Sequence, residues 1–115
     1  MDAVKVIDHK LALQQAGGNA ELAADLFNML LQDLSPQKHA IQAALEASDY
    51  QTLQHLVHKL NGATTYCGVP ALKLSLNNLE TDLKNSKTTN IATGVDLVVM
   101  EIDRVLSHTQ KLESQ

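Results

Sequence analysis

Apolar residues recur at helical spacing in five segments of the chain, and short polar breaks separate these segments. The first segment is a short amphipathic stretch from about residue 8 to 15. Gly17 and Gly18 supply the backbone freedom to end it, and Asn19 is a plausible N-cap for the next segment. The pattern therefore predicts a brief first helix followed by longer ones.

The second segment carries apolar residues on more than one helical stripe from Ala20 to Leu34. We expect this helix to be deeply buried, with the short first helix packed on its second side. Ser35 and Pro36 leave two interpretations open. They are either the N-cap and first-turn proline of a new helix, or a kink inside one long helix that continues through Leu45.

Three more helices follow, the first of them capped by Asp49, with an apolar face from Leu53 to Ala63. The chain breaks at Cys67-Gly68 and restarts at Val69-Pro70. Short loops make consecutive helices antiparallel neighbours, so the pattern predicts an all-α, antiparallel four-helix bundle with a short additional N-terminal helix. We interpret residues 1–115 as a single domain with a core from about residue 8 to 112. The apolar positions of the last two helices are Leu72, Leu76, Leu79 and Leu83, and Ile91, Val95, Val98, Ile102, Val105 and Leu112.

Composition narrows the function classes. The formal charge is -4 without a Lys/Arg cluster, so nucleic acid is not an expected partner. No apolar run approaches the roughly 18 to 20 residues of a bilayer span, and the N-terminus lacks the parts of a signal peptide, so we expect a soluble chain without membrane contact. The single Cys67 fits a reducing cytosol. No second heptad seam remains, which predicts a monomer.

The third long segment exposes a histidine. On a helical wheel of about 100° per residue, His58 lies about 140 to 160° from the apolar face centred near Leu53 and Leu60. Gly62 lies one turn later on the same outward face, where glycine costs about 1 kcal/mol relative to alanine. The missing side chain gives a partner room to approach, and the small side chain of Thr65 does not obstruct this surface. This pattern predicts an accessible nucleophile on a rigid helix, against the alternative of a surface histidine without function.

The longer string around this histidine carries more information. Residues 58–68 read HKLNGATTYCG. They resemble the signature of the histidine-containing phosphotransfer (HPt) family, which is a histidine followed by Leu or Ile at +2, Gly at +4, small residues, and Gly at +10. The Gly-Gly-Asn helix start, the Pro-interrupted helix, the "ASDY" cap and Leu79-Glu80 are also similar to HPt modules. The string HKLNGATTYCGVPALK most resembles the C-terminal HPt domain of Gac/BarA-type hybrid sensor kinases, which implies a module of a longer, membrane-anchored protein.

The resemblance implies reversible phosphoryl transfer in a phosphorelay. The Nε2 atom of His58 would attack the phosphorylated aspartate of a receiver domain and pass the group on to a response regulator. The receivers of the parent hybrid kinase and of the response regulator are the implied partners, and the location is the cytoplasmic side of the inner membrane. Such transfer depends on positioning and charge neutralisation. The receiver brings Mg²⁺, so we expect this domain to bind no metal or cofactor and to have no kinase activity of its own.

A nucleophilic Nε2 requires the proton on Nδ1, and we expect Glu80 to accept a hydrogen bond from Nδ1–H. In an antiparallel hairpin around Gly68-Val69, residues whose numbers sum to about 138 lie abreast, as His58 and Glu80 do; the family also has a polar residue at this offset. The alternative is an i,i+4 surface pair of Glu80 with Lys84. Many family members carry lysine at +3, where Asn61 stands here, whereas Lys59 at +1 keeps a cation beside the site. We expect receiver docking at Gln54, His55, Asn61, Thr65 and Lys73.

The sequence is less consistent with three other functions. His55 and His58 are near enough to share a metal ion, but no third ligand is evident. A helical adaptor without chemistry would use His58 and Gly62 only to shape a contact surface. An independent enzyme is disfavoured because there is no P-loop or convergent acid-base pair. We interpret Cys67 as a buried or half-buried structural thiol, and the remaining histidines as surface residues: His9, His39 and His108.

Overall fold

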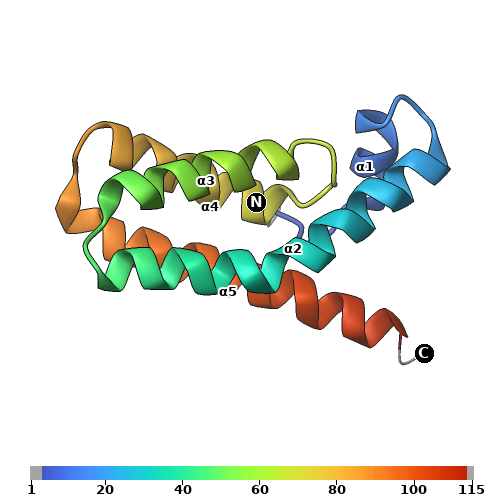
Figure 1. Ribbon diagram of the computed structural model, residues 1–115. Helices are drawn as coiled ribbons and strands as arrows, with labels where there is room; N and C mark the ends of the chain where they lie inside the picture. The colour runs from blue at the N-terminus through green and yellow to red at the C-terminus, as the bar shows by residue number, and fades with distance from the viewer. Residues whose placement is uncertain (1–3, 114–115) are drawn as a thin grey trace.

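The computed structural model describes the backbone of residues 4–113 and the side chains of residues 4–109. The regular elements of this described part are α1 (His9–Gln15), α2 (Ala20–Glu46), α3 (Tyr50–Thr64), α4 (Pro70–Lys84) and α5 (Thr88–Glu113). Helices α2 to α5 form an antiparallel bundle, and α1 packs against α2 at one end of it (Figure 1). The fold is therefore all-α, as predicted.

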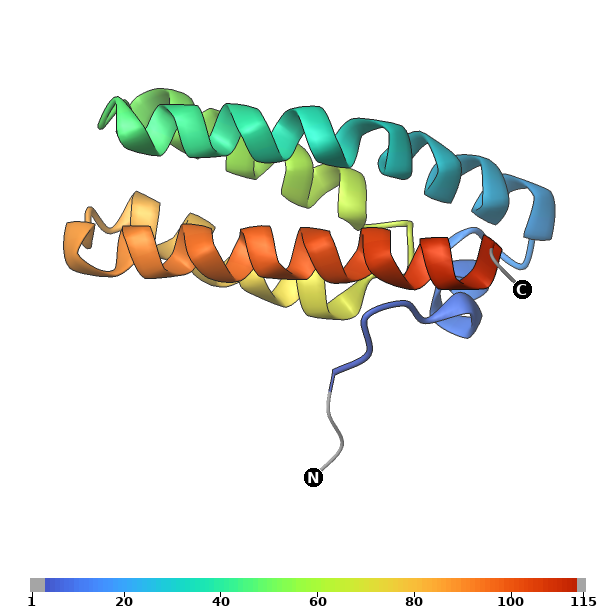
Figure 2. The same ribbon diagram turned by 90° about the horizontal axis from the view of Figure 1, so that it is seen from below.

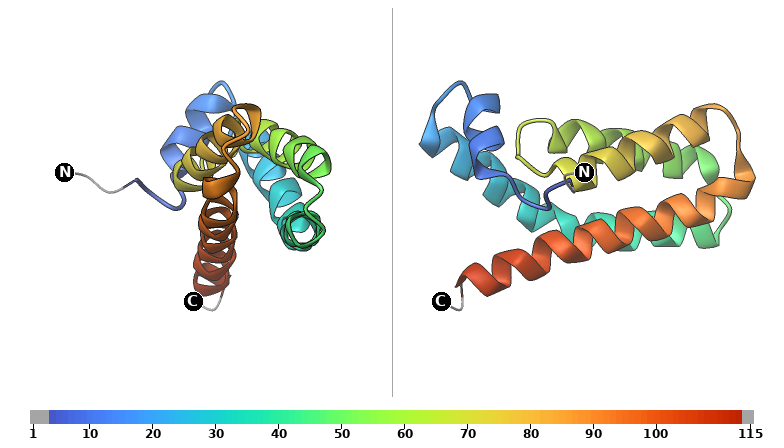
Figure 3. Two further views of the ribbon diagram at one scale, coloured as in Figure 1. Left: turned by 90° about the vertical axis from the view of Figure 1, so that its left-hand side faces the viewer. Right: turned by 180° about the vertical axis from the view of Figure 1, so that it is seen from behind.

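The four long helices close into a ring. Helix α3 packs between α2 and α4, and α5 packs against both α4 and α2, which the end-on view of Figure 3 makes visible. Consecutive helices run antiparallel because the loops that join them are short. The α3–α4 pair is thus a hairpin whose residues face each other in a fixed register.

Local capping chemistry sets the start of three helices. Asp8, Asn19 and Asp49 precede α1, α2 and α3, and a side-chain oxygen of each accepts the backbone N–H three residues later at 3.0 to 3.2 Å. These contacts satisfy N–H groups that have no partner inside the helix. Both predicted caps, Asn19 and Asp49, are confirmed.

Helix α2 resolves the ambiguity at Pro36. The helix continues through this residue to Glu46, so the interpretation as one long helix is correct (Figure 2). Pro36 has no N–H to donate within the helix, and its side chain lies on the exposed surface, where water can hydrate the unpaired carbonyl one turn earlier.

The core lies along the bundle axis. Leu53, Val57 and Leu60 of α3 are buried, as predicted, and Val6 joins them from upstream of the expected start of the core. The side chain of Leu112 lies outside the described residues. The remaining apolar positions expected in the last two helices are all buried: Leu72, Leu76, Leu79, Leu83, Ile91, Val95, Val98, Ile102 and Val105.

Two expectations about burial were wrong. The segment from Ala20 to Leu34 is not deeply buried along its whole length, since Leu22 is 43% and Met29 is 64% exposed. This half of α2 extends past α3 and α4, and α1 covers only part of it (Figure 1). In α3, Ala63 is exposed and Thr64 takes the buried position, because Thr64 continues the stripe through Val57 and Leu60.

The loop between α3 and α4 requires a glycine at position 68. Gly68 has a φ of +66°, and a Cβ there would overlap the carbonyl oxygen of Asp8. The backbone of the same residue accepts from the N–H of Asp8 at 2.7 Å and donates to the Gln15 side chain at 3.1 Å. Helix α1 therefore docks on this loop and supports the α3–α4 hairpin.

Candidate phosphotransfer site

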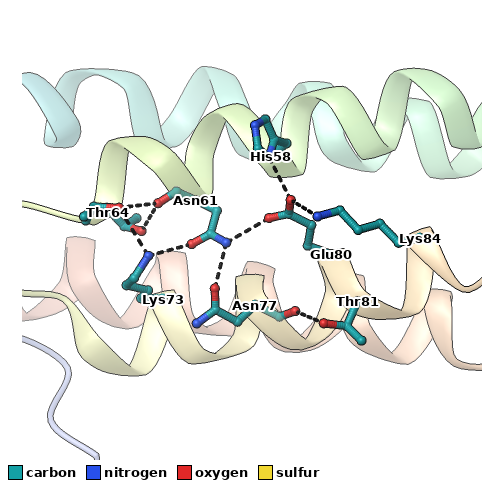
Figure 4. Close-up of polar contacts among 9 residues, drawn as sticks. His58, Asn61, Thr64, Lys73, Asn77, Glu80, Thr81 and Lys84 are labelled. Carbon is teal, nitrogen blue, oxygen red and sulfur yellow. Dashed lines mark hydrogen bonds and ion pairs between the residues drawn. The ribbon is translucent and has the colours of Figure 1, made fainter.

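His58 projects from the outer face of α3 toward solvent. Its side chain is 72% exposed, as the helical wheel predicted, and its Nδ1 lies 2.7 Å from Oε2 of Glu80 on α4 (Figure 4). The Glu80 side chain is only 10% exposed. The hairpin register thus brings an exposed imidazole and a buried carboxylate into contact.

Three hydrogen-bond donors converge on the Glu80 carboxylate. Asn61 donates to Oε1 at 2.9 Å, while His58 and Lys84 lie 2.7 and 3.3 Å from Oε2. The hydrogen bond from Asn61, followed by those from His58 and Lys84, lowers the pKa of Glu80 to about 2 against the opposing effect of burial. The carboxylate is therefore ionised near neutral pH and can only accept.

This ionisation decides which imidazole nitrogen carries the proton. Because Glu80 offers only acceptors, Nδ1 of His58 donates to it, and the neutral ring then keeps a lone pair on Nε2. No hydrogen bond joins Nε2 to another side chain in the described part of the protein. The arrangement presents a nucleophilic nitrogen to solvent on a ring whose orientation is held.

Further polar side chains extend the contact between α3 and α4. Asn61 donates to Asn77 at 2.7 Å and accepts from Lys73 at 3.0 Å, and Lys73 also donates to Thr65 at 3.2 Å. Figure 4 shows these contacts continuing from one helix to the other. We call the connected set the polar seam: His58, Asn61, Thr65, Lys73, Asn77, Glu80 and Lys84.

His58 stands between two surface hollows. One is lined by His58 together with Gln51, Thr52, Gln54 and His55. The other is lined by His58, Asn61, Gly62, Thr65, Lys73 and Glu80. A Cβ at Gly62 would meet no atom within 4 Å, so the space beside the imidazole is open.

Comparison with known proteins places this geometry in a family. The Hpt domain family model matches residues 25–108. The chain belongs to the Hpt domain family. It is therefore a phosphotransfer domain of the kind found in hybrid sensor kinases, and HPt domains of this kind interact with receiver domains in phosphorelays.

Relatives and a solved structure agree with this assignment. The chain is 46% identical to the sensor histidine kinase GacS of Pseudomonas protegens over 81 residues, covering 70% of this chain and 9% of that protein. It is 31% identical to the histidine-protein kinase BarA of Escherichia coli over 107 residues, covering 92% of this chain and 12% of that protein. The chain thus spans about a tenth of the length of these relatives.

The structural match is to the HPT domain of an Hpt sensor hybrid histidine kinase from Shewanella. It has a TM-score of 0.89 and 30% identity, and it covers 98% of this chain and 97% of that chain. The agreement extends over α1 as well as the bundle, since so little of either chain is left out.

The structure brings the predicted site residues of this HPt domain together around His58. All five expected docking residues line one of the two hollows, Gln54 and His55 on one side and Asn61, Thr65 and Lys73 on the other. Asn61 and Lys73 are more enclosed than expected for docking residues, because they hydrogen-bond within the polar seam. The docking role itself stays a prediction.

Lys59, Lys84 and Asn77 lie within four residues of His58 or Glu80 in the sequence. Lys59 is exposed, and no ion pair joins it to another described side chain, so its predicted role beside the phosphate stays a prediction. Lys84, considered only as a competitor for Glu80, contacts the carboxylate together with His58. Asn77 was missed. Its position three residues before Glu80, on the same face of α4, was the available signal.

The remaining titratable residues lie elsewhere. Cys67 is 3% exposed, its thiol donates to the Ala63 carbonyl at 3.2 Å, and burial raises its pKa, which confirms a buried structural thiol. His9, His39 and His108 are exposed, as expected.

Within the described residues, no group of three His, Cys, Asp or Glu side chains could hold a metal ion. None of the described helices has the length and apolar character of a bilayer span.

Proposed function

We propose that Nε2 of His58 accepts a phosphoryl group from the aspartyl phosphate of one receiver domain and passes it to the aspartate of a response regulator. The observation that carries this proposal is the 2.7 Å contact between Nδ1 of His58 and the buried, ionised Glu80. This contact leaves the Nε2 lone pair exposed for in-line attack.

The chemistry balances without a further reactant. The Nε2 lone pair forms the N–P bond as the bond between phosphorus and the aspartyl oxygen breaks, and the aspartate leaves as a carboxylate. The proton stays on Nδ1, so the phosphorylated ring carries a positive charge that the Glu80 carboxylate neutralises. The second transfer reverses these steps on the next receiver.

Several features of the surroundings belong to the same proposal. The receiver supplies Mg²⁺, and this domain binds no metal or cofactor. The two hollows beside His58 dock the receivers of the parent hybrid kinase and of the response regulator. Lys84 and Lys59 bring positive charge near the phosphoryl group.

The domain acts as a monomer in isolation, on the cytoplasmic side of a membrane-anchored kinase.

Receiver domains that have been phosphorylated with radiolabelled acetyl phosphate in the presence of Mg²⁺ test this function directly, because the label is on the phosphoryl group. We expect acid-labile, base-stable label to move to the native chain and to His39→Gln, which changes an exposed histidine on α2. His58→Gln should accept none. A folded native chain that takes no label from several receivers would instead support a helical adaptor without chemistry.

A further inference from the structure

Asn61 lies between two groups with opposite hydrogen-bonding needs. On one side is the Glu80 carboxylate, which can only accept, and on the other is the Lys73 ammonium, which can only donate. The Asn61 amide meets both, because Nδ2 donates to Glu80 at 2.9 Å and Oδ1 accepts from Lys73 at 3.0 Å. The neighbours therefore determine the orientation of this amide.

The second amide hydrogen of Asn61 is also used. It is donated to Oδ1 of Asn77 at 2.7 Å, so both hydrogens of Nδ2 and the oxygen Oδ1 have partners. Figure 4 shows the amide in the middle of this chain of contacts, with Lys73 at one end and His58 at the other. A side chain held on three sides has little rotational freedom.

We propose that Asn61 is a positioning residue for phosphoryl transfer. It bridges Lys73 and Glu80 and thereby holds the Glu80 carboxylate where that group accepts a hydrogen bond from Nδ1–H of His58. This inference rests on the proposed function of His58. No hydrogen bond joins Asn61 to the imidazole itself in the described part of the protein, so Asn61 acts through Glu80.

Few other side chains can replace Asn61 in this bridge. Leucine has a similar size but no polar atoms, and aspartate turns an acceptor toward the Glu80 carboxylate. Lysine would turn a donor toward Lys73. An amide offers an acceptor on one side and, on the other, two N–H donors, which Asn61 uses for Glu80 and Asn77.

Glu80 keeps one other anchor besides His58 when Asn61 is removed. Lys84 contacts Oε2 at 3.3 Å, the oxygen that His58 also uses, and its side chain is 60% exposed. Without a donor on Oε1, the carboxylate can rotate about its axis and follow Lys84 toward solvent. The His58 ring then loses the acceptor that keeps the proton on Nδ1, and Nε2 becomes protonated in part of the population.

The test combines a tautomer measurement with a rate. Long-range ¹H–¹⁵N NMR at pH 8, with the His58 signal assigned by its loss in His58→Gln, reports which ring nitrogen carries the proton. We expect Nδ1–H in the native chain and a shift toward Nε2–H in Asn61→Leu. Transfer from an acetyl phosphate-charged receiver should slow about tenfold, the lower range seen when the partner of a metal-ligating histidine is removed.

Matched variants separate positioning from folding. Asn61→Asp keeps the size of the side chain and its acceptor for Lys73, and it should show the same tautomer shift; it decides the question if Asn61→Leu does not fold. Thr81→Ala changes an exposed hydroxyl of α4 that contacts the Asn77 carbonyl, and it should leave tautomer and rate unchanged.

The failures of the two ideas are distinguishable. Native tautomer and native rate in folded Asn61→Leu would overturn the positioning role while the phosphotransfer function stands. A native chain that accepts no phosphoryl group would overturn the function. In that case the NMR comparison still shows whether Asn61 holds the proton on Nδ1.

Discussion

Helix α4 has two contrasting sides, and adjacent residues mark them. Leu79 is fully buried and faces α5, where a Cβ on Gly94 would lie 2.9 Å from its Cδ1. Glu80 faces α3 and belongs to the polar seam. The α4–α5 contact is an apolar, close-packed interface, whereas the edge of the α3–α4 contact consists of charged and amide groups that bind one another.

This difference shows how a small bundle combines stability with chemistry. Apolar burial along α5 stabilises the fold without any directional requirement. A buried carboxylate would destabilise it if left without partners, but Glu80 accepts from three donors, which offsets the loss of hydration. The apolar core therefore supplies most of the stability and holds the site rigidly, while the three donors keep the burial of Glu80 from destabilising the fold.

Leu79→Ala should weaken the apolar packing between α4 and α5. We expect the free energy of unfolding to fall by about 3 kcal/mol, because the fully buried side chain leaves a cavity beside Gly94. Urea denaturation followed by circular dichroism measures this change. The transfer rate of the folded fraction should stay within about twofold of native, and a much larger loss would show that the polar seam depends on this packing.

Glu80→Gln should remove the charge at the centre of the polar seam, and its effect on the stability of the fold should depend on pH. The pKa of Glu80 is about 2 in the folded chain against an ordinary value of 4.5, so the unfolded chain binds more protons between these values. The resulting stability is fully present above pH 4.5 and is lost as the pH falls toward 2. At pH 7 we expect the free energy of unfolding of the native chain to exceed that of the variant by on the order of 2 kcal/mol, because water screens part of the full effect of the pKa shift.

Thermal unfolding of both chains across this pH range measures the difference. The two stability curves should converge as the pH falls from 4.5 to 2. Curves that stay parallel would mean that the ionised carboxylate does not stabilise the fold. Transfer by Glu80→Gln should be slower near neutral pH, because an amide can accept from or donate to Nδ1 and no longer fixes the tautomer.

Gly62→Ala should have the smallest effect on stability of these three substitutions. The new methyl group meets no atom within 4 Å, so the helix gains about 1 kcal/mol of stability. It also fills part of the hollow beside His58, and transfer from a receiver should slow. Ala63→Gly, at an exposed position one residue on, should lose about 1 kcal/mol and leave transfer unchanged. Equal transfer rates in Gly62→Ala and the native chain would contradict the access role of Gly62.

Much of the site could be predicted because it depends on short-range geometry. Helical periodicity alone places His58 and Gly62 on the outer face of α3. The short loop after α3 makes the α3–α4 register simple to count, and the observed contact of His58 with Glu80 follows from it. The same counting treated Lys84 as a competitor, since spacing along one helix does not reveal that a carboxylate with two oxygens can bind several donors.

Local sequence is sufficient to predict the helix starts at Asn19 and Asp49, the apolar stripes of the bundle and the outward position of His58, because caps and periodicity act over a few residues. The three-dimensional arrangement of the helices was needed to establish the continuation of α2 through Pro36, the exposure of Leu22, and the bridge of Asn61 between Lys73 and Glu80. These depend on where helices end relative to one another and on how side chains from two helices meet, and neither is encoded in the spacing along a single helix.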